Sequence, residues 1–177
     1  QRQMCIRDRL GHSIGEITAA CLSGVLDLDD ALRLVRERGR LMQQLPSGAM
    51  RSVALGEREL AALLPASLSI AAVNADELCV VSGPHADVDA FAAELERRDV
   101  VSRALHTSHA FHSAMLDPML APLGEVLAGL RPGRVHLPYL SNCTGDWITD
   151  DEANDPLYWT RHARGGVRFS RRCSSTG

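Results

Sequence analysis

The sequence predicts a mixed α/β fold in which a small subdomain is inserted into a larger core. Three observations lead to this prediction. Amphipathic stretches alternate with short apolar runs; the elements between residues 49 and 109 read strand, helix, strand, strand, helix, strand; and a glycine-flanked serine turn precedes a helix near residue 13. With 177 residues, 45% of them hydrophobic, the chain can bury one domain-sized core.

The elements predicted before residue 49 are two helices. The first covers residues 16–26 (EITAACLSGVL). The second begins at Asp27, a residue type that caps helix N-termini, and ends before Pro46. Its apolar stripe is expected at Leu28, Leu32, Val35, Gly39 and Met42, with Gly39 permitting close approach of a neighbour.

The inserted subdomain is predicted from short elements with alternating periods. Their order is that of the split βαβ, or ferredoxin-like, arrangement. The strands are expected at residues 50–55, on both sides of the turn at 74–76 within 68–83, and at 100–106, and the helices at 56–64 and 86–98.

After residue 109 the chain returns to the core. A helix is predicted from Ser113 to Leu130, a strand over residues 135–142, and a short helix opened by Asp155 and Pro156. The core therefore comprises residues 10–48 and 110–169, and the small subdomain residues 49–109. Residues 1–9 and 170–177 show no helical or strand period, and we expect them to lie outside the fold.

Composition excludes several classes of protein. Acidic residues outnumber basic ones, 22 to 19, so no basic surface for nucleic acid is expected. No apolar run is long enough to span a membrane, and no secretory signal is visible. The five cysteines are odd in number and never spaced C-x-x-C, which favours reduced thiols over disulfides or zinc. We therefore expect a cytoplasmic protein.

The turn Gly11-His12-Ser13-Ile14-Gly15 matches the pattern G-x-S-x-G. Its glycines permit a sharp strand-to-helix turn that exposes a serine hydroxyl, as at the top of an α/β-hydrolase sheet. The following helix would direct backbone N–H groups and its positive dipole end at an oxyanion. Ser13 is thus a candidate nucleophile on an α/β-hydrolase-like core.

A serine nucleophile needs a base, most often histidine. His106, His109 and His112 cluster where the small subdomain returns the chain to the core, although spacing alone leaves open which of them faces Ser13. Their three-residue spacing does not converge on one metal ion, so no metal is expected.

Arg38 is the arginine of the second helix that falls inside its apolar arc on a helical wheel, whereas Arg33, Arg36 and Arg40 face solvent. A buried guanidinium demands a carboxylate or ligand partner. Two interpretations follow: a structural salt bridge, or a bidentate clamp on a substrate carboxylate.

From residue 10 to residue 169 the chain resembles the malonyl-CoA:acyl-carrier-protein acyltransferase domains of modular type I polyketide synthases. The motifs that carry the resemblance occur in the family's order: GHSIGE, RGRLM, LCVVSGP, HTSHAFHS, SHAFHSAMLDPML, PYLSNCTGDWIT and DPLYWTRHAR followed by VRF.

The resemblance implies a role for each matching site residue. Ser13 matches the acylated serine and His112 its base, in a dyad without a catalytic aspartate. Asn142 matches the residue whose main-chain carbonyl orients the base, and Ile14 the one whose N–H serves the oxyanion hole. Arg38 matches the arginine that binds the malonyl carboxylate, in agreement with the helical wheel.

The resemblance also implies the substrate. The HAFH motif with Phe111 is similar to the malonyl-selective signature, where methylmalonyl-selective relatives carry YASH, and His109 stands at the tyrosine position. The malonyl group would pass from malonyl-CoA to Ser13 and then to the phosphopantetheine thiol of an acyl carrier protein, beside a ketosynthase domain. No bound cofactor or metal is implied.

Two departures from the family leave alternatives open. No counterpart precedes residue 10 for the family's Gly-Gln-Gly motif or for the strand leading into the turn, and SRRCSSTG replaces its closing helix. We therefore expect an incomplete core with exposed apolar surface, and negligible activity of the isolated chain. The alternatives are an inactive fragment, a free-standing transacylase of fatty-acid synthesis, and a serine hydrolase, which would need a third acidic residue and an HGGG-type loop.

Overall fold

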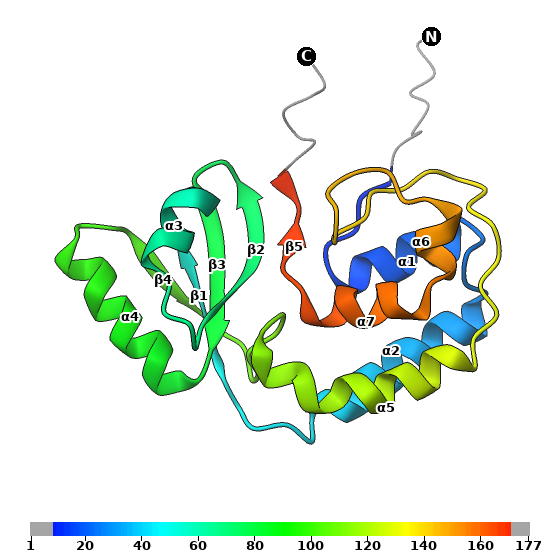
Figure 1. The fold of residues 1–177 in the computed structure, drawn as a ribbon, viewed down its shortest axis with the longest axis horizontal. Coiled ribbons are helices and arrows are strands. Elements are labelled where there is room, and N and C mark those ends of the chain that lie inside the picture. The colour runs from blue at the N-terminus through cyan, green and yellow to red at the C-terminus, as the bar shows by residue number, and fades with distance from the viewer. Residues whose placement is uncertain (1–8, 171–177) are drawn as a thin grey trace, which may run out of the picture.

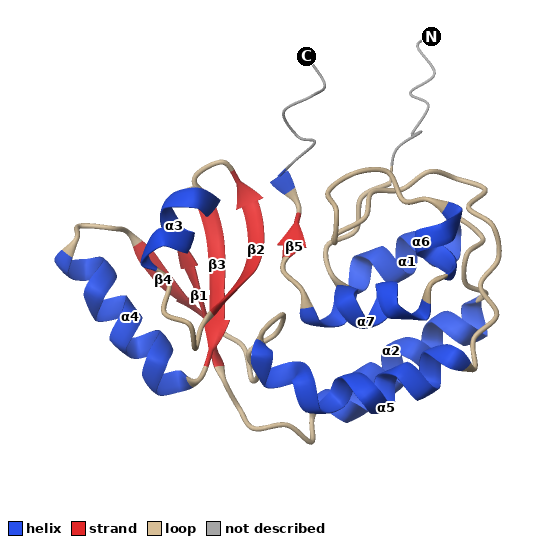
Figure 2. Ribbon diagram, in the orientation of Figure 1, coloured by secondary structure: helices blue, strands red, loops and turns tan. Residues whose placement is uncertain are grey.

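The computed structural model describes residues 9–170, in two regions that lie side by side (Figure 1). The predictions for residues 1–8 and 171–177 fall outside the described residues. Residues 49–105, here called the sheet region, contain four strands and two helices. Residues 9–48 and 106–166, here called the helical region, supply the remaining helices (Figure 2). The structure is thus a mixed α/β fold, as predicted.

The sheet region has the element order that the sequence predicts. It runs β1 (Ala49–Val53), α3 (Glu57–Leu63), β2 (Ser69–Ala75), β3 (Leu78–Gly83), α4 (His85–Arg97) and β4 (Ser102–Leu105). The spatial order is β4-β1-β3-β2, and all three pairings are antiparallel. Each predicted element agrees with an observed one to within a few residues.

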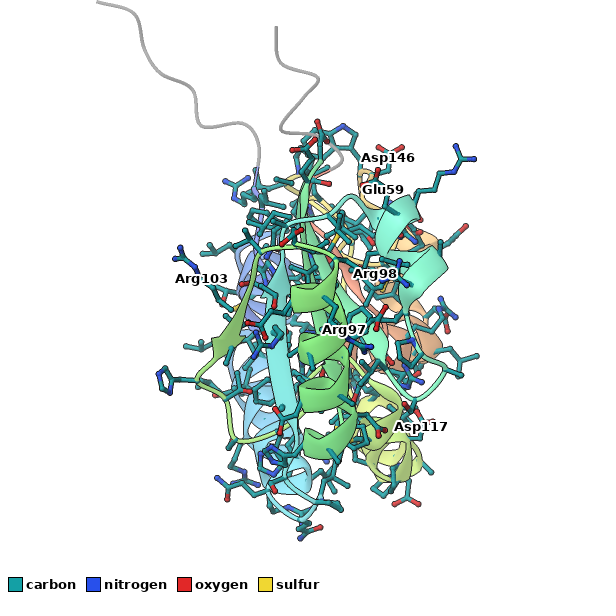
Figure 3. The ribbon with its side chains drawn as sticks, turned by 90° about the vertical axis from the view of Figure 1, so that its left-hand side faces the viewer. Glu59, Arg97, Arg98, Arg103, Asp117 and Asp146 are labelled. Carbon is teal, nitrogen blue, oxygen red and sulfur yellow. The ribbon has the colours of Figure 1, made fainter. Side chains whose placement is uncertain are left out.

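One face of this sheet is covered by its own two helices. Val53 and Val81 point to this face, where they pack against Leu60 of α3 and Leu95 of α4. Figure 3 views the molecule from this side, with α4 in front of the strands and Arg97 and Arg98 projecting from it. Because neighbouring side chains on a strand point in opposite directions, Val80 lies on the other face, toward the helical region.

The helical region packs its helices around one apolar core. They are α1 (Ile14–Leu22), α2 (Leu28–Met42), α5 (Asp117–Ala128) with a preceding 3₁₀ turn (Ala114–Leu116), α6 (Asp150–Asn154) and α7 (Pro156–Arg164). Asp27 caps α2 by accepting from Asp30 N, and Asp155 caps α7 by accepting from Leu157 N. These starts are the predicted ones, and α2 and α5 lie along each other (Figure 1).

The buried face of α2 differs from the predicted stripe. The residues buried on this helix are Ala31, Leu34, Arg38, Leu41 and Met42. Leu28 and Leu32 are 63% and 59% exposed, so their assignment to the stripe is wrong. Gly39 is exposed and a Cβ there would contact nothing, so its predicted close approach is also wrong. Both errors have the same cause: the prediction centred the buried stripe on Val35, which is only half-buried.

The strand predicted over residues 135–142 is reduced to single bridges. Tyr139 pairs in parallel with Arg9, so the expectation that Arg9 lies outside the fold is wrong, and Leu140 pairs with Trp147. A strand is stable only with a partner strand alongside, and residues 9–170 contribute no longer partner here. Within the described residues, the helical region therefore contains no extended parallel sheet of the kind expected for the core.

The last strand, β5 (Val167–Arg168), joins the two regions. It follows α7 and pairs in parallel with β2 at the sheet edge, so the sheet has five strands in the order β4-β1-β3-β2-β5. Val167 is buried with Met50 and Ala72 on the face of the sheet that looks toward the helical region. This pairing holds the C-terminal end of α7 against the small sheet (Figure 1).

Candidate active site

Ser13 lies on a sharp turn at the start of α1. Its backbone has φ 52° and ψ −114°, a left-handed conformation that is strained for a residue with a side chain. A Cβ added to Gly11 would lie 2.0 Å from the carbonyl of Gly15, so only glycine fits there. The turn therefore has the strand-to-helix form that the G-x-S-x-G pattern predicts.

His112 is the histidine that reaches Ser13. The Ser13 Oγ and His112 Nε2 atoms are 2.8 Å apart, and His112 is only 4% exposed. His112 Nδ1 lies 2.8 Å from the carbonyl oxygen of Gly165. Because a carbonyl can only accept, Nδ1 carries the proton and Nε2 accepts from the serine hydroxyl. The question that spacing left open among three histidines is thereby answered.

Burial keeps His112 neutral. Desolvation is the main reason that the pKa of His112 falls to about 3, and the nearby charges of Arg38 and His162 lower it further, while the bond to Gly165 opposes the shift. A neutral imidazole with a free Nε2 lone pair can take the serine proton at physiological pH.

Asn142 does not orient the base, so that expectation is wrong. Its carbonyl oxygen accepts from Arg168 N, and the carbonyl beside His112 belongs to Gly165. Instead, the Asn142 side chain holds the serine turn. Its Oδ1 accepts from Ser13 N at 2.7 Å, and its Nδ2 donates to Gly11 O at 2.8 Å.

Arg38 is buried, as the helical wheel predicts, and it lies beside Ser13. It is 3% exposed and its Nη2 donates to Ser13 Oγ at 3.2 Å. Its Nε and Nη1 atoms are buried without a hydrogen-bond partner among the described residues. Burial lowers the pKa of Arg38 to about 10, with Glu16 opposing the shift, so the guanidinium remains charged at pH 7. No salt bridge involves Arg38 within residues 9–170, so its buried Nε and Nη1 atoms are donors without a protein partner.

The other arginines of α2 confirm the wheel. Arg33, Arg36 and Arg40 are exposed, and Arg36 and Arg40 both pair with Glu37 on the same helix. Surface pairs of this kind contribute little to stability. Arg38 thus differs from its neighbours because of its position on the helix.

Ile14 is the first residue of α1, immediately after Ser13. The first N–H groups of a helix have no partner within the helix. This N–H is therefore available at the turn to a negatively charged oxygen, beside the positive end of the helix dipole. The Ile14 side chain is 50% exposed and lines the cavity described next.

A cavity of about 400 Å³ opens in front of Ser13 between the two regions. The helical region contributes the reactive groups, and the small sheet contributes an apolar wall. The lining residues are His12, Ser13, Ile14, Arg38, Met42, Met50, Ala71, Ala72, Asn74, Val80, Leu105, Thr107, Phe111 and His112. Phe111 lines this cavity as expected.

His109 is not among the residues that line the cavity. Its Nδ1 is bonded to the Ser108 hydroxyl, and its ring lies 6.3 Å from the Phe111 ring, centroid to centroid. The expectation that His109 shapes the pocket directly is therefore corrected, because the chain turns between His109 and Phe111. In residues 9–170, no group of three or more His, Cys, Asp or Glu side chains is arranged to hold a metal ion.

Sequence reasoning missed two residues of this site. Gly165 acts through its main-chain carbonyl, which no side-chain pattern can reveal. Glu16 is fully buried and bonds to the main-chain N–H of Asn142. A wheel of α1 would have found Glu16, because it shares the buried face with Ile17, Ala19 and Ala20.

The geometry defines a mixed α/β protein in which a serine on a strained turn is hydrogen-bonded to a buried histidine. Comparison with known families then gives its membership: the family model described as "Acyl transferase domain" matches residues 8–176, and the chain belongs to this family. The match includes most of the C-terminal segment in which the motif analysis found no family pattern.

The curated relatives are large synthases. The chain is 44% identical over 162 residues to mycoketide-CoA synthase of Mycobacterium tuberculosis, covering 91% of the chain and 4% of that protein. It is 47% identical over 164 residues to polyketide synthase GfsA of Streptomyces halstedii, covering 90% of the chain and 2% of that protein. The chain thus spans a small part of the curated relatives it matches.

Solved acyltransferase domains have the same fold. The acyl transferase domain of SpnD, in complex with 2-(pent-4-yn-1-yl)malonyl, superposes with a TM-score of 0.88 at 44% identity, over 92% of this chain and 40% of that one. The domain from the second module of the salinomycin polyketide synthase gives the same TM-score and identity, over 92% and 39%. FabD of Acinetobacter baumannii, 24% identical with a TM-score of 0.88, shares the fold.

None of the helices described in residues 9–170 is both long enough and apolar enough to cross a membrane.

Proposed function

We propose that this chain carries the acyl-transfer site of a polyketide synthase, moving a malonyl group from malonyl-CoA to the phosphopantetheine thiol of an acyl carrier protein. The observation that carries the proposal is the position of Arg38. A buried cation with two unpartnered donor nitrogens lies 3.2 Å from the Ser13 hydroxyl. A substrate with a free carboxylate near its reactive carbonyl can bind the Arg38 guanidinium and present its carbonyl to the Ser13 hydroxyl at the same time.

The first half-reaction loads the serine. Ser13 Oγ attacks the thioester carbonyl carbon while His112 Nε2 takes the hydroxyl proton. The N–H of Ile14 donates to the oxyanion of the tetrahedral intermediate. The carbon–sulfur bond then breaks, and the departing coenzyme A sulfur receives the proton from His112. The product is a malonyl ester of Ser13.

The second half-reaction repeats these steps with the carrier thiol. His112 takes the thiol proton, the sulfur attacks the ester carbonyl, and the carbon–oxygen bond breaks as Ser13 Oγ recovers its proton. Arg38 binds the same carboxylate throughout, which keeps the acyl carbonyl directed at the dyad.

The apolar wall of the cavity supports selection of the acyl group. Phe111 lies among Met50, Ala71 and Val80 in the lining, and a bulky ring there would crowd a branched α-carbon. The SpnD domain was solved with a malonyl derivative, which supports a malonyl-type substrate. Shape alone discriminates one methyl group by only about 1–3 kcal/mol, so selection against methylmalonyl is expected to be incomplete.

We also propose that the chain has a ferredoxin-like small subdomain and an α/β-hydrolase-like core. The antiparallel order β4-β1-β3-β2 with two helices on one face supports a ferredoxin-like small subdomain at residues 49–109. The serine turn supports an α/β-hydrolase-like core at residues 10–48 and 110–169. A neighbouring ketosynthase domain is the partner expected within a synthase. Free thiols at Cys21, Cys79 and Cys143 support work in the reducing cytoplasm.

Incubation of an acyltransferase domain that contains this chain together with its N-terminal part with malonyl-CoA tests the proposal by intact-mass spectrometry. We expect one malonyl adduct on Ser13, absent from the Ser13→Ala variant, which transfers to a carrier protein bearing phosphopantetheine but not to the apo form. An adduct that persists in Ser13→Ala, or that forms equally from acetyl-CoA, would contradict the assignment.

A further inference from the structure

Glu16 is a buried carboxylate that the acyl-transfer steps do not use. It lies on α1 three residues after Ser13 and is 0% exposed. Its Oε2 accepts from Asn142 N at 2.7 Å, its Oε1 accepts from the Tyr158 hydroxyl, and His162 Nε2 lies 3.3 Å from Oε2. Burying a carboxylate is costly unless its oxygens are bonded, and here both oxygens have partners.

The bond from Asn142 connects Glu16 to the nucleophile turn. The Asn142 side chain accepts from Ser13 N and donates to Gly11 O, so one amide group bridges both ends of the turn. The position of that amide depends on its own main chain, which Glu16 holds through the N–H. Two consecutive 2.7 Å hydrogen bonds thus lead from the carboxylate to the backbone of Ser13.

The turn needs this support because Ser13 adopts a strained backbone conformation. Strained residues persist only where surrounding contacts over-determine them. The Asn142 amide supplies two such contacts, and relaxation of the turn would move Ser13 Oγ away from its 2.8 Å approach to His112.

We propose that Glu16 is a positioning residue for acyl transfer: its hydrogen bond to the main chain of Asn142 sets the Asn142 side chain, and thereby holds Ser13 Oγ within reach of His112. This inference rests on the proposed function for its substrate and on the geometry for its mechanism. The essential property is a hydrogen-bond acceptor at the position of Oε2, whereas the negative charge is secondary.

Tyr158 provides a matched control within the same network. Its hydroxyl bonds to the other oxygen of Glu16 and to Ser141 Oγ, but not to Asn142. Burial, together with the nearby Glu16, raises the pKa of Tyr158 well above its ordinary value, so the hydroxyl stays protonated. Tyr158→Phe therefore perturbs the buried network and leaves the connection between Glu16, Asn142 and Ser13 in place.

The test compares two variants of Glu16. Glu16→Gln retains a hydrogen-bond acceptor, whereas Glu16→Met keeps the length of the side chain but removes the acceptor. A fluorophosphonate probe reads Ser13 reactivity per folded molecule, and malonyl-CoA reads acylation. We expect Glu16→Met to lower both rates about a hundredfold with KM for malonyl-CoA little changed, because a displacement of about 1 Å can cost that much. Glu16→Gln and Tyr158→Phe are expected to stay within about threefold of wild type, since neither removes the acceptor from Asn142.

Three outcomes would overturn the inference. The first is full reactivity of Glu16→Met. The second is an equal loss of rate in folded Glu16→Met and in Tyr158→Phe. The third is a low rate in Glu16→Gln together with a shifted midpoint in its pH profile, because that result would indicate an electrostatic role for Glu16. If Glu16→Met does not fold, Glu16→Asp gives the same test, because its acceptor is withdrawn by one methylene. A wild-type chain that reacts with the probe but not with malonyl-CoA would contradict the proposed function and leave this inference standing.

Discussion

The two regions of the molecule differ most in the polar groups that they bury. Nine polar or charged residues of the described chain are buried, and only Ser82 of these lies in the sheet region. The other eight belong to the helical region: Glu16, Ser23, Arg38, His112, Ser113, Ser141, Asn142 and His162. Buried polar groups stabilise a fold less readily than apolar ones, so their concentration marks the region that performs chemistry.

The sheet region contributes to function by shape. It supplies five apolar residues to the cavity wall, Met50, Ala71, Ala72, Val80 and Leu105, and one polar residue, Asn74. Its own core of Val53, Leu60, Val81 and Leu95 lies on the far side of the sheet. One region therefore carries the serine, histidine and arginine of the candidate site, and the other carries most of the apolar wall that faces them. Five substitutions or conditions test this division, from the largest expected effect to the smallest.

We predict the largest effect for His112→Ala, which removes the base from the helical region. Malonylation of Ser13 should slow about a thousandfold, within the usual range for loss of a general base. His106→Ala and His109→Ala are matched controls, because neither histidine contacts Ser13, and both should react at the wild-type rate. Rapid-quench mass spectrometry measures all three. A wild-type rate in His112→Ala would remove the basis for the dyad.

Leu95→Ala should destabilise the sheet region without changing the rate of malonylation. Leu95 is 0% exposed in the cluster under α4, and truncation of such a residue costs about 3 kcal/mol of the free energy of unfolding. Malonylation per folded molecule should be unchanged. Denaturant unfolding measures the first quantity, with exposed Leu28→Ala as the control. A loss of specific activity would show that the regions are not separable in this way.

Arg38→Ala should change substrate preference. Loss of a bidentate, charge-assisted contact is expected to slow malonyl transfer about a hundredfold. Acetyl transfer should change little, because acetyl-CoA has no second carboxylate. Arg36→Ala, on the exposed face of the same helix, is the control. If the ratio of malonyl to acetyl transfer stays at its wild-type value, Arg38 does not bind the substrate carboxylate.

Acid should weaken the folded state through His112. Its pKa is about 3 in the folded chain and near 6.5 when unfolded, so the unfolded chain binds the extra proton as pH falls. The free energy of unfolding should therefore drop by about 2 kcal/mol between pH 7 and pH 5. His112→Gln should lack this part of the pH dependence. Urea unfolding at both pH values measures the difference, and parallel pH curves for the two proteins would contradict the shift.

The smallest effect is predicted for Phe111→Ala, at the boundary between the regions. Opening the cavity should raise methylmalonyl transfer relative to malonyl about tenfold, as expected for one methyl group. Competition between the two thioesters in one reaction measures this ratio. His109→Ala is the informative comparison, because His109 does not line the cavity and should leave the ratio unchanged. An unchanged ratio in Phe111→Ala would assign selectivity to another part of the wall.

The sheet region was predictable because its signals are local. Each strand and helix shows its own period, and a turn residue such as Asp76 separates two of the strands. The prediction of a strand at residues 135–142 was wrong because a strand depends on pairing, which is not a local signal. Apolar residues there suit a strand, but a strand also needs a partner strand, and the described chain supplies only single bridges from Arg9 and Trp147.

In the candidate site, too, the features that depend on local sequence were predictable and the others were not. The G-x-S-x-G turn identified Ser13, and the helical wheel placed Arg38 inside α2, because both depend on spacing within one segment. The sequence by itself thus determined the serine turn, the buried cation and the chain order of elements in the sheet region. Only the tertiary structure decided that Gly165, not Asn142, holds His112, and that Asn142 and Glu16 support the turn. A main-chain carbonyl is the same in every residue, so its role depends on where the folded chain brings it.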